Sequence, residues 1–161
     1  MVSKKINRRD LREKSLQILY AYEFRGEGLT SICNDVLVDI SDSGARDFSI
    51  GLVNKVISNK KLLDESIKER VKNWEMDRIA LIDRLLLKIG IAEILYFPDI
   101  PPKVTINEVI EIAKEFSTSN SGKFINGILD AILSQLKESG KLVKTGRGLV
   151  EESLPKKSKK K

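Results

Sequence analysis

Four basic side chains near the N-terminus are the residues whose types and spacing most directly indicate chemistry. They are Lys5, Arg8, Arg9 and Arg12. If this segment is helical, positions three, four and seven apart lie on one face, so the four charges gather there. Like charges repel, and cations are also disfavoured at the positive N-terminal end of a helix. A polyanion such as RNA would offset this repulsion, so the stripe predicts phosphate contacts; a solvated charged face is the simpler interpretation.

An aromatic residue and a polar turn add further candidate RNA contacts. Tyr20 lies about two turns beyond Arg12, where it could stack on an unpaired base, or it could be a half-buried core tyrosine. Asn120, Ser121 and Lys123 lie where a helix begins, and the free amides and positive dipole of a helix N-terminus can hold a phosphate. An ordinary helix cap explains these residues about as well, because the turn is not a G-x-x-x-x-G-K phosphate loop.

The composition argues against catalysis and against a metal centre. The chain has no histidine, which removes the commonest general base and the commonest metal ligand, and its one cysteine is Cys33. Glu93, Glu108 and Glu111 have no evident nucleophile or metal-binding partner in the sequence. We therefore predict a protein that is not an enzyme and that needs no cofactor or metal.

Length and charge indicate one globular domain with a basic end. The chain has 161 residues, of which 41% are hydrophobic and 32% charged, and its net charge is +6. It has no apolar run long enough for a transmembrane span and no apolar segment typical of a signal peptide, so we expect no membrane association and a cytoplasmic protein. Helical periodicity is lost after Gly140, so the expected domain is residues 1–140, followed by a disordered basic tail at 141–161.

Apolar periodicity predicts an all-α fold, a compact bundle of about seven helices. The expected elements are residues 8–24, a short helix and loop at 29–40, 45–58, 61–74, 78–96, a helix opened by Thr105, and 121–137. Asp77 is expected to cap the helix at 78–96, which is apolar on nearly every face and therefore central. Thr105 and Glu108 have the spacing of a capping box. Asp83 and Arg84 interrupt the central helix and indicate a partner-binding surface or a snorkelling edge.

Two motifs in the C-terminal half resemble those of a known family. Residues 98–108 read Pro-Asp-Ile-Pro-Pro-Lys-Val-Thr-Ile-Asn-Glu, and residues 121–127 read Ser-Gly-Lys-Phe-Ile-Asn-Gly. They resemble the P-x-x-P-x-K-V-x-I-N-E and S-x-K-F-x-N-G runs of the NusB family of transcription antitermination factors. Residues 8–13 resemble the opening helix of that family, and the likeness extends over about residues 7–137.

The resemblance implies two helical subbundles and a non-catalytic RNA-binding factor. It implies binding to the single-stranded boxA element of ribosomal RNA leader transcripts, together with the ribosomal protein NusE, in RNA polymerase antitermination complexes. By motif position, it implies RNA contacts from Arg8, Arg9, Arg12, Tyr20, Asn120, Ser121 and Lys123, and a partner-facing side around Asp83 and Arg84. The family often has Asp-Ser-His-Lys where this chain has residues 120–123 as Asn-Ser-Gly-Lys.

Two alternatives to this function remain open from the sequence. One is a protein-interaction bundle or homodimer that has no RNA role. The other is a stand-alone relative of the helical domain that precedes the catalytic part of some ribosomal RNA cytosine methyltransferases. The sequence contains no Gly-rich cofactor loop that would favour methyl transfer.

Overall fold

The computed structural model describes residues 5–71 and 78–150, and within these ranges the chain is helical and has no strand. Seven α-helices and a short 3-10 helix follow one another in this order: α1 (Arg8–Arg25), α2 (Leu29–Val36), α3 (Ser43–Ser58), α4 (Lys60–Val71), α5 (Leu81–Tyr96), α6 (Pro102–Phe116), α7 (Ser119–Glu138) and η2 (Gly146–Leu149). The all-α prediction is confirmed. No helix in the described residues is long and apolar enough to cross a membrane.

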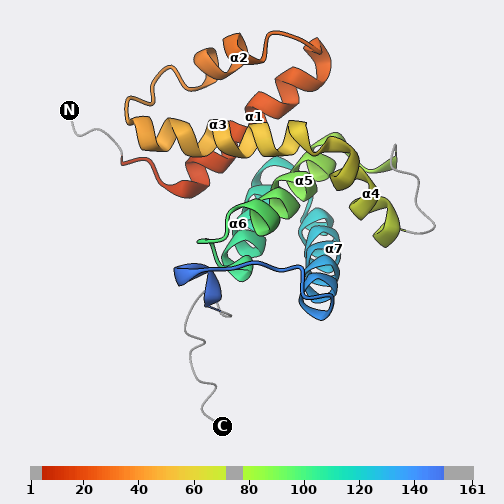
Figure 1. The fold of residues 1–161 in the computed structure, drawn as a ribbon. Helices are drawn as coiled ribbons and strands as arrows, with labels where there is room; N and C mark the ends of the chain where they lie inside the picture. The colour runs from red at the N-terminus through yellow and green to blue at the C-terminus, as the bar shows by residue number, and fades with distance from the viewer. Residues whose placement is uncertain (1–4, 72–77, 151–161) are drawn as a thin grey trace.

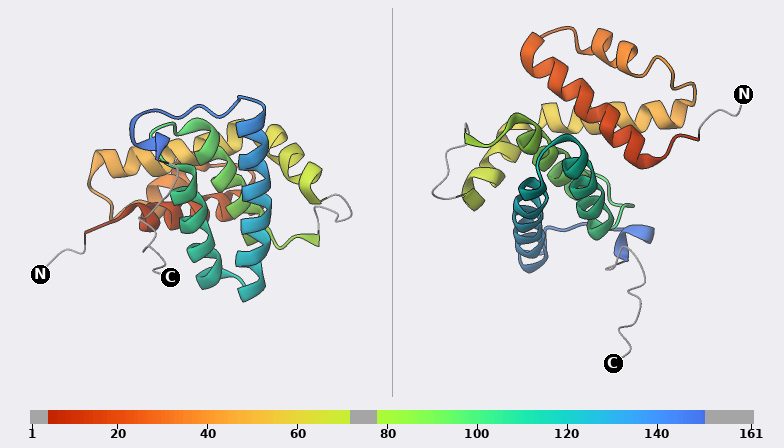
Figure 2. Two further views of the ribbon diagram at one scale, coloured as in Figure 1. Left: turned by 90° about the horizontal axis from the view of Figure 1, so that it is seen from below. Right: turned by 180° about the vertical axis from the view of Figure 1, so that it is seen from behind.

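The helices form two groups that share α5. Helices α1, α2 and α3 pack together on one side of the molecule, and α4, α6 and α7 pack with α5 on the other (Figure 1). Helix α5 also contacts α1 and α3, so it joins the two groups. The view from behind in Figure 2 shows the same division. The two helical subbundles implied by the family resemblance are therefore present.

Helix α5 is buried as its apolar sequence predicts. Leu86, Leu87, Ile89 and Ile91 are fully buried. Three charged residues of the same helix are also buried, and each has a partner on another helix: Asp83 with Ser121, Lys88 with Asp64, and Glu93 with Arg12. Burying a charge is costly unless it is paired, so these contacts constrain how α5 packs with α1, α4 and α7.

The first helices begin and end where local chemistry indicates. The side chain of Asn7 accepts from the amide of Asp10, and the Asp10 carboxylate accepts from the amide of Asn7, which forms a capping box for α1. Gly26 ends α1 at φ 69°, a left-handed conformation that glycine adopts without steric cost. The side chain of Asp42 caps α3 by accepting from Ala45.

Two predicted helix starts in the C-terminal half are wrong. Helix α6 begins at Pro102, not at Thr105, because proline is well suited to the first helical position, where its missing N–H is not needed. Thr105 is therefore inside the helix, and the predicted capping box with Glu108 does not form. Helix α7 begins at Ser119, because Thr118 is its cap and exchanges capping hydrogen bonds with Ser121.

The described part of the predicted tail is folded onto the domain. The amide of Thr145 donates to the carbonyl of Pro98 at 3.0 Å, and Lys144 Nζ donates to the carbonyl of Phe97 at 3.0 Å. Gly148 is buried so close to Pro98 that an added Cβ would lie 1.8 Å from the Pro98 carbonyl oxygen. The prediction of a disordered tail from residue 141 is therefore wrong for residues 141–150. Residues 151–161, the predicted cap Asp77 and the predicted end of α4 at Trp74 lie outside the described residues.

Candidate nucleic-acid interface

The first turn of α1 presents exposed basic side chains. Arg8 and Arg9 are exposed in this turn, and Lys5 is exposed but precedes the helix, which begins at Arg8. The prediction that Lys5 shares one helix face with the arginines is therefore wrong, because helical spacing does not apply before the Asn7 cap. The Arg8 guanidinium carbon lies 4.0 Å from the centre of the Phe48 ring on α3. A guanidinium stacked on an aromatic face is held in place, while the N–H groups at its edge can still donate to an anion. The packing of α1 on α3 thus orients the Arg8 guanidinium, and phosphate contact by Arg8 stays a prediction.

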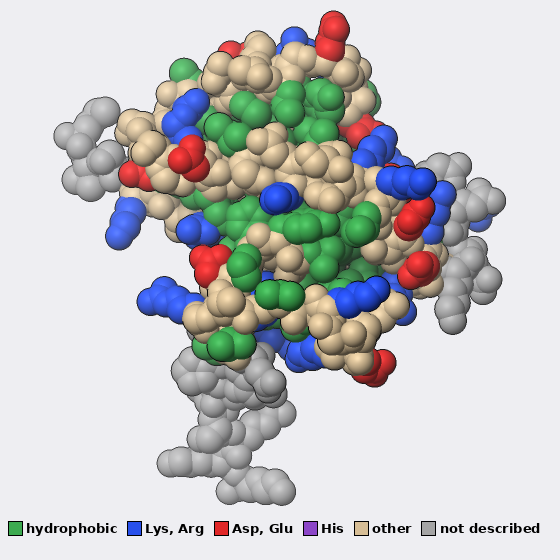
Figure 3. Space-filling model, viewed as in Figure 1, with side chains coloured by type: hydrophobic (Ala, Val, Ile, Leu, Met, Phe, Trp, Pro, Cys, Tyr) green, Lys and Arg blue, Asp and Glu red, His purple; other side chains and the backbone are tan. Residues whose placement is uncertain are grey.

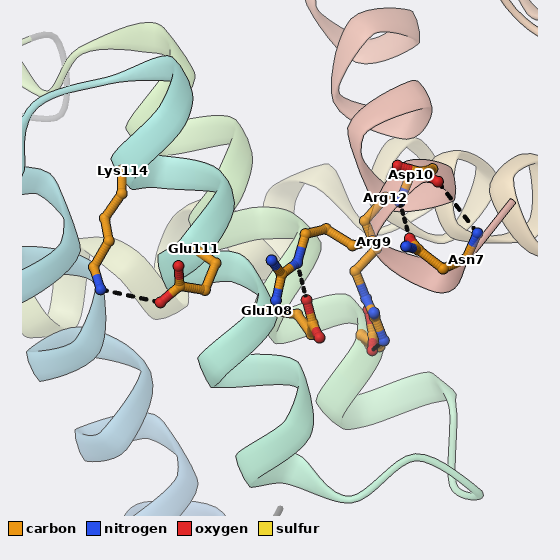
Figure 4. A network of polar contacts seen from close by, with 8 residues as sticks. Asn7, Arg9, Asp10, Arg12, Glu108, Glu111 and Lys114 are labelled. Carbon is orange, nitrogen blue, oxygen red and sulfur yellow. Dashed lines mark hydrogen bonds and ion pairs between the residues drawn. The ribbon is translucent and has the colours of Figure 1, made fainter. Parts of the chain in front are cut away.

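Arg9 is exposed but already has an anionic partner. Its Nε donates to Glu108 Oε2 on α6 at 2.5 Å, and the two side chains are 43% and 25% exposed (Figure 4). This hydrogen bond to Glu108 is the largest cause that raises the pKa of the Arg9 guanidinium. One turn further along α6, Glu111 pairs with Lys114 at 3.0 Å. Arg9 therefore lies beside a row of carboxylates on α6.

The prediction that Arg12 shares the exposed basic face is wrong. Arg12 is 2% exposed, and its Nε and Nη2 donate to the two carboxylate oxygens of Glu93 at 2.8 and 2.5 Å. The Thr105 hydroxyl also donates to Glu93, at 2.9 Å. The spacing placed Arg12 near the stripe, but that edge of α1 faces α5 and α6. The Arg12 guanidinium is hydrogen-bonded within a buried network, so an external polyanion cannot reach it.

Tyr20 lies on the surface with a second aromatic residue. Tyr20 is 42% exposed and Phe24, one turn later on α1, is 70% exposed. Their ring centres are 5.1 Å apart, with the rings tilted by 59°. Tyr20 is therefore not part of the fully buried core, although more than half of its surface is covered, and the exposed part of the ring is accessible for stacking. RNA contact by Tyr20 stays a prediction.

The start of α7 separates the three residues predicted to contact RNA. Asn120 and Lys123 are exposed on the first turns of the helix, so both remain candidates. Asn120 is inside the helix and is not its cap. Ser121 is buried, and its hydroxyl donates to Asp83 Oδ2 at 2.8 Å. Ser121 therefore positions the α5–α7 contact and presents little surface to a ligand.

Asp83 lies beside the α7 turn, which brings two predicted sites together. A pocket of about 310 Å³ is lined by Asp83, Asn120, Ser121 and Phe124, together with residues 78–80 and 117–118. Asp83 itself is 8% exposed and Arg84 is half-buried. Because Asp83 is largely buried and accepts a hydrogen bond from Ser121, its carboxylate is not freely accessible to a partner protein. A partner contact by this region remains a prediction.

Acidic residues border the basic stripe. Burial, followed by repulsion from Glu115, raises the pKa of the Glu13 carboxyl on α1.

On the face shown in Figure 3, Lys and Arg side chains lie mainly around the edges, and hydrophobic side chains reach the surface near the middle. The positive charge on that face is thus dispersed. Among the described residues, no group of three or more His, Cys, Asp or Glu side chains is arranged to hold a metal ion.

Two residues of this surface were not identified from the sequence. The capping-box spacing predicts a helix-cap role for Glu108, whereas Pro102 at the first helical position places Glu108 in the helix interior. Phe24 was not singled out, although its spacing of four from Tyr20 puts both rings on one face of α1. No local signal could have paired Arg9 with Glu108, because the two residues are 99 positions apart.

Comparisons with known proteins agree with this architecture. The NusB family model matches residues 9–134. Two relatives are the transcription antitermination proteins NusB of Chloroherpeton thalassium (47% identical, over 91% of this chain and 70% of the relative) and of Salinibacter ruber (44% identical, over 89% and 91%). NusB of T. maritima has a similar structure, with a TM-score of 0.77 and 36% identity over 86% of this chain and 100% of that chain.

A further solved structure with this fold contains other molecules. It is the crystal structure of antitermination factors NusB and NusE in complex with dsRNA. The matched chain has a TM-score of 0.72 and 25% identity over 80% of this chain and 96% of that chain. The matched relatives and structures thus share a class, that of helical proteins of transcription antitermination. The chain belongs to the NusB family.

Proposed function

We propose that this chain is a non-catalytic, RNA-binding transcription antitermination factor that acts in the cytoplasm. The observation that carries the proposal is the exposed basic start of α1, formed by Arg8 and Arg9 and preceded by the exposed Lys5, within a fold shared with NusB proteins. Phosphate contacts from such side chains supply affinity that is independent of sequence, whereas base contacts supply specificity.

The RNA surface would run along α1 and reach the start of α7. Arg8 and Arg9 would contact phosphates, and Tyr20 would stack on an unpaired base. Asn120 and Lys123 would contact the RNA from the first turns of α7, where unpaired helix amides favour an anion. Ser121 and Arg12 would support these elements from the interior.

The family supports a more specific role. The RNA would be a single-stranded boxA-type element of ribosomal RNA leader transcripts, and NusE would bind alongside it within an RNA polymerase antitermination complex. The support is that a NusB protein of the same fold is found with NusE and double-stranded RNA in a solved structure. The region around Asp83 and Arg84, next to the α7 turn, is the candidate partner surface.

An RNA mobility-shift assay with and without NusE tests this function. We expect a boxA-type single-stranded RNA to bind more tightly than a scrambled RNA of equal length, and NusE to increase the difference. Equal binding of both RNAs, with and without NusE, would instead favour the alternative of a protein-interaction bundle or homodimer without an RNA role.

A further inference from the structure

Arg9 differs from the other exposed basic residues because a carboxylate of a distant helix already holds it. Its Nε is bonded to Glu108, while Lys5 and Arg8 have no acidic partner in any contact found within the described residues. Glu108 comes from α6, and its side chain lies directly against the basic turn of α1 (Figure 4). The carboxylate therefore occupies the Nε side of the guanidinium, where an RNA phosphate could otherwise accept a hydrogen bond.

The pair is solvated enough to exchange partners. The side chain of Arg9 is 43% exposed and that of Glu108 is 25% exposed, so water can hydrate each group after separation. An exposed ion pair contributes little to stability, and its loss costs the fold little. The buried Arg12–Glu93 pair three residues away cannot open in this way, because its side chains are 3% and 0% exposed.

Other carboxylates strengthen the competition for Arg9. Glu111 on α6 and Glu13 on α1 both attract the Arg9 charge, in addition to Glu108. A phosphate that approaches Arg9 while Glu108 stays in place is repelled by these neighbouring negative charges. The favourable arrangement with RNA bound is one in which Glu108 has released the guanidinium and the phosphate has replaced it.

We propose that Glu108 is an intramolecular competitor of RNA phosphate for Arg9, and that it sets the affinity threshold of the basic stripe. RNA binding exchanges the Arg9–Glu108 pair for an Arg9–phosphate pair. A polyanion that contacts Arg9 alone gains little binding free energy, because the Arg9–Glu108 pair is lost. RNA that also contacts Arg8 and Tyr20 makes further contacts that offset the loss of this pair. Glu108 thereby disfavours weak, nonspecific polyanions. This inference rests on the proposed RNA-binding function.

The test is a double-mutant cycle on RNA affinity with Glu108→Gln and Arg9→Gln in the full chain. A boxA-type single-stranded RNA and a scrambled RNA of equal length serve as probes. Glu108→Gln should tighten binding of both RNAs about two- to fivefold at low salt, with the larger gain for the scrambled RNA, and the gain should shrink as salt screens the charges. Arg9→Gln should weaken binding, and Glu108→Gln should add nothing further once Arg9 is absent.

A matched control separates the local pair from the change in net charge. Glu65→Gln removes one exposed carboxylate from α4 and changes the net charge of the chain by the same amount. If Glu65→Gln tightens RNA binding as much as Glu108→Gln does, the change in net charge alone explains the gain in affinity, and the proposal is overturned. Thermal unfolding of each variant verifies that the affinities compare folded proteins.

The remaining outcomes distinguish this inference from the proposed function. If Arg9→Gln weakens RNA binding but Glu108→Gln weakens it too, Glu108 positions Arg9 instead of competing for it; RNA binding by the stripe stands and the inference fails. If Glu108→Gln leaves affinity unchanged, the inference fails alone. If both Arg8→Gln and Arg9→Gln leave RNA affinity unchanged, the stripe is not the RNA surface, and both proposals fall.

Discussion

Two arginine–glutamate pairs connect α1 to the second group of helices, and they differ in their access to water. The side chains of Arg12 and Glu93 are 3% and 0% exposed. Arg12 donates two hydrogen bonds to Glu93, and the Thr105 hydroxyl donates a third. Arg9 and Glu108 are 43% and 25% exposed and share one hydrogen bond. The two arginines lie three positions apart on α1, but their glutamate partners come from α6 and α5, and the two pairs differ in exposure to water.

The contrast shows what solvent does to an ion pair. Breaking a buried pair leaves a charge without partner or water, which strongly destabilises the fold. Breaking an exposed pair returns both groups to water at little cost. The Arg12 network is therefore suited to holding α1 against α5 and α6, and the Arg9 pair is suited to exchange with a ligand. Substitutions in the two pairs should separate stability from RNA binding.

The largest expected effect is loss of stability on breaking the buried pair. Arg12→Ala leaves the Glu93 carboxylate buried and unpaired, so we expect the free energy of unfolding to fall by about 3–5 kcal/mol. Arg9→Ala is the matched control and should cost at most about 1 kcal/mol. Urea unfolding of both variants measures the difference. Equal losses for the two variants would contradict the contrast between the pairs.

A second contrast lies at the start of α7, between a buried and an exposed polar residue. Ser121→Ala removes the hydrogen bond to Asp83 Oδ2 and leaves that largely buried carboxylate oxygen without its donor, which should cost about 1–3 kcal/mol. Asn120→Ala, one residue away on the surface, should change stability by less than about 0.5 kcal/mol. Thermal unfolding of the two variants tests this; a larger loss for Asn120→Ala would show that the turn is held differently.

The third prediction concerns RNA binding by the exposed basic residues. Replacing Arg8 and Arg9 with alanine should weaken RNA binding several-fold and lower the salt slope by about one for each lost phosphate contact. Lys68→Ala, an exposed lysine on α4, is the control and should leave the slope unchanged. Binding isotherms at several salt concentrations supply the slopes. An unaltered slope for the double variant would remove both arginines from the RNA surface.

The smallest expected effect is a pH dependence at the acidic border of the stripe. Burial and repulsion from Glu115 raise the pKa of Glu13, so the folded chain holds this proton more tightly than the unfolded chain does. Stability from this group is therefore present at low pH and is lost as pH rises from the ordinary carboxyl pKa through the raised one. Glu13→Gln should flatten that part of the curve and slightly stabilise the protein at neutral pH. A steeper curve for the variant would contradict the direction of the shift.

Much of the fold could be predicted from the sequence because its signals are local. The apolar faces of α1, α3, α5 and α7 and the glycine that ends α1 depend on residues within a few turns of each other. The errors have a common origin as well. Short local patterns predict helix starts at Thr105 and Ser121, whereas Pro102 and the Thr118 cap provide better starts a few residues earlier.

The candidate site was predictable only in part. Residue types and spacing indicated a basic stripe, an aromatic neighbour and a polar turn, and Arg8, Arg9, Tyr20 and Asn120 are indeed exposed. Spacing alone could not separate Arg12 from this group, because the helical period locates a residue on a face but does not say what covers that face.

The sequence by itself determined that this chain is helical and has basic residues at the start of α1, since composition and periodicity are properties of neighbouring residues. Its two C-terminal motifs carried the family resemblance. Only the tertiary structure decided which charges water can reach. Glu93 and Glu108 are 81 and 99 residues from the arginines that they bind, and only the packing of α5 and α6 against α1 brings them together. That packing buries one arginine in a structural pair and leaves the other exposed to water, as the proposed exchange with a phosphate requires.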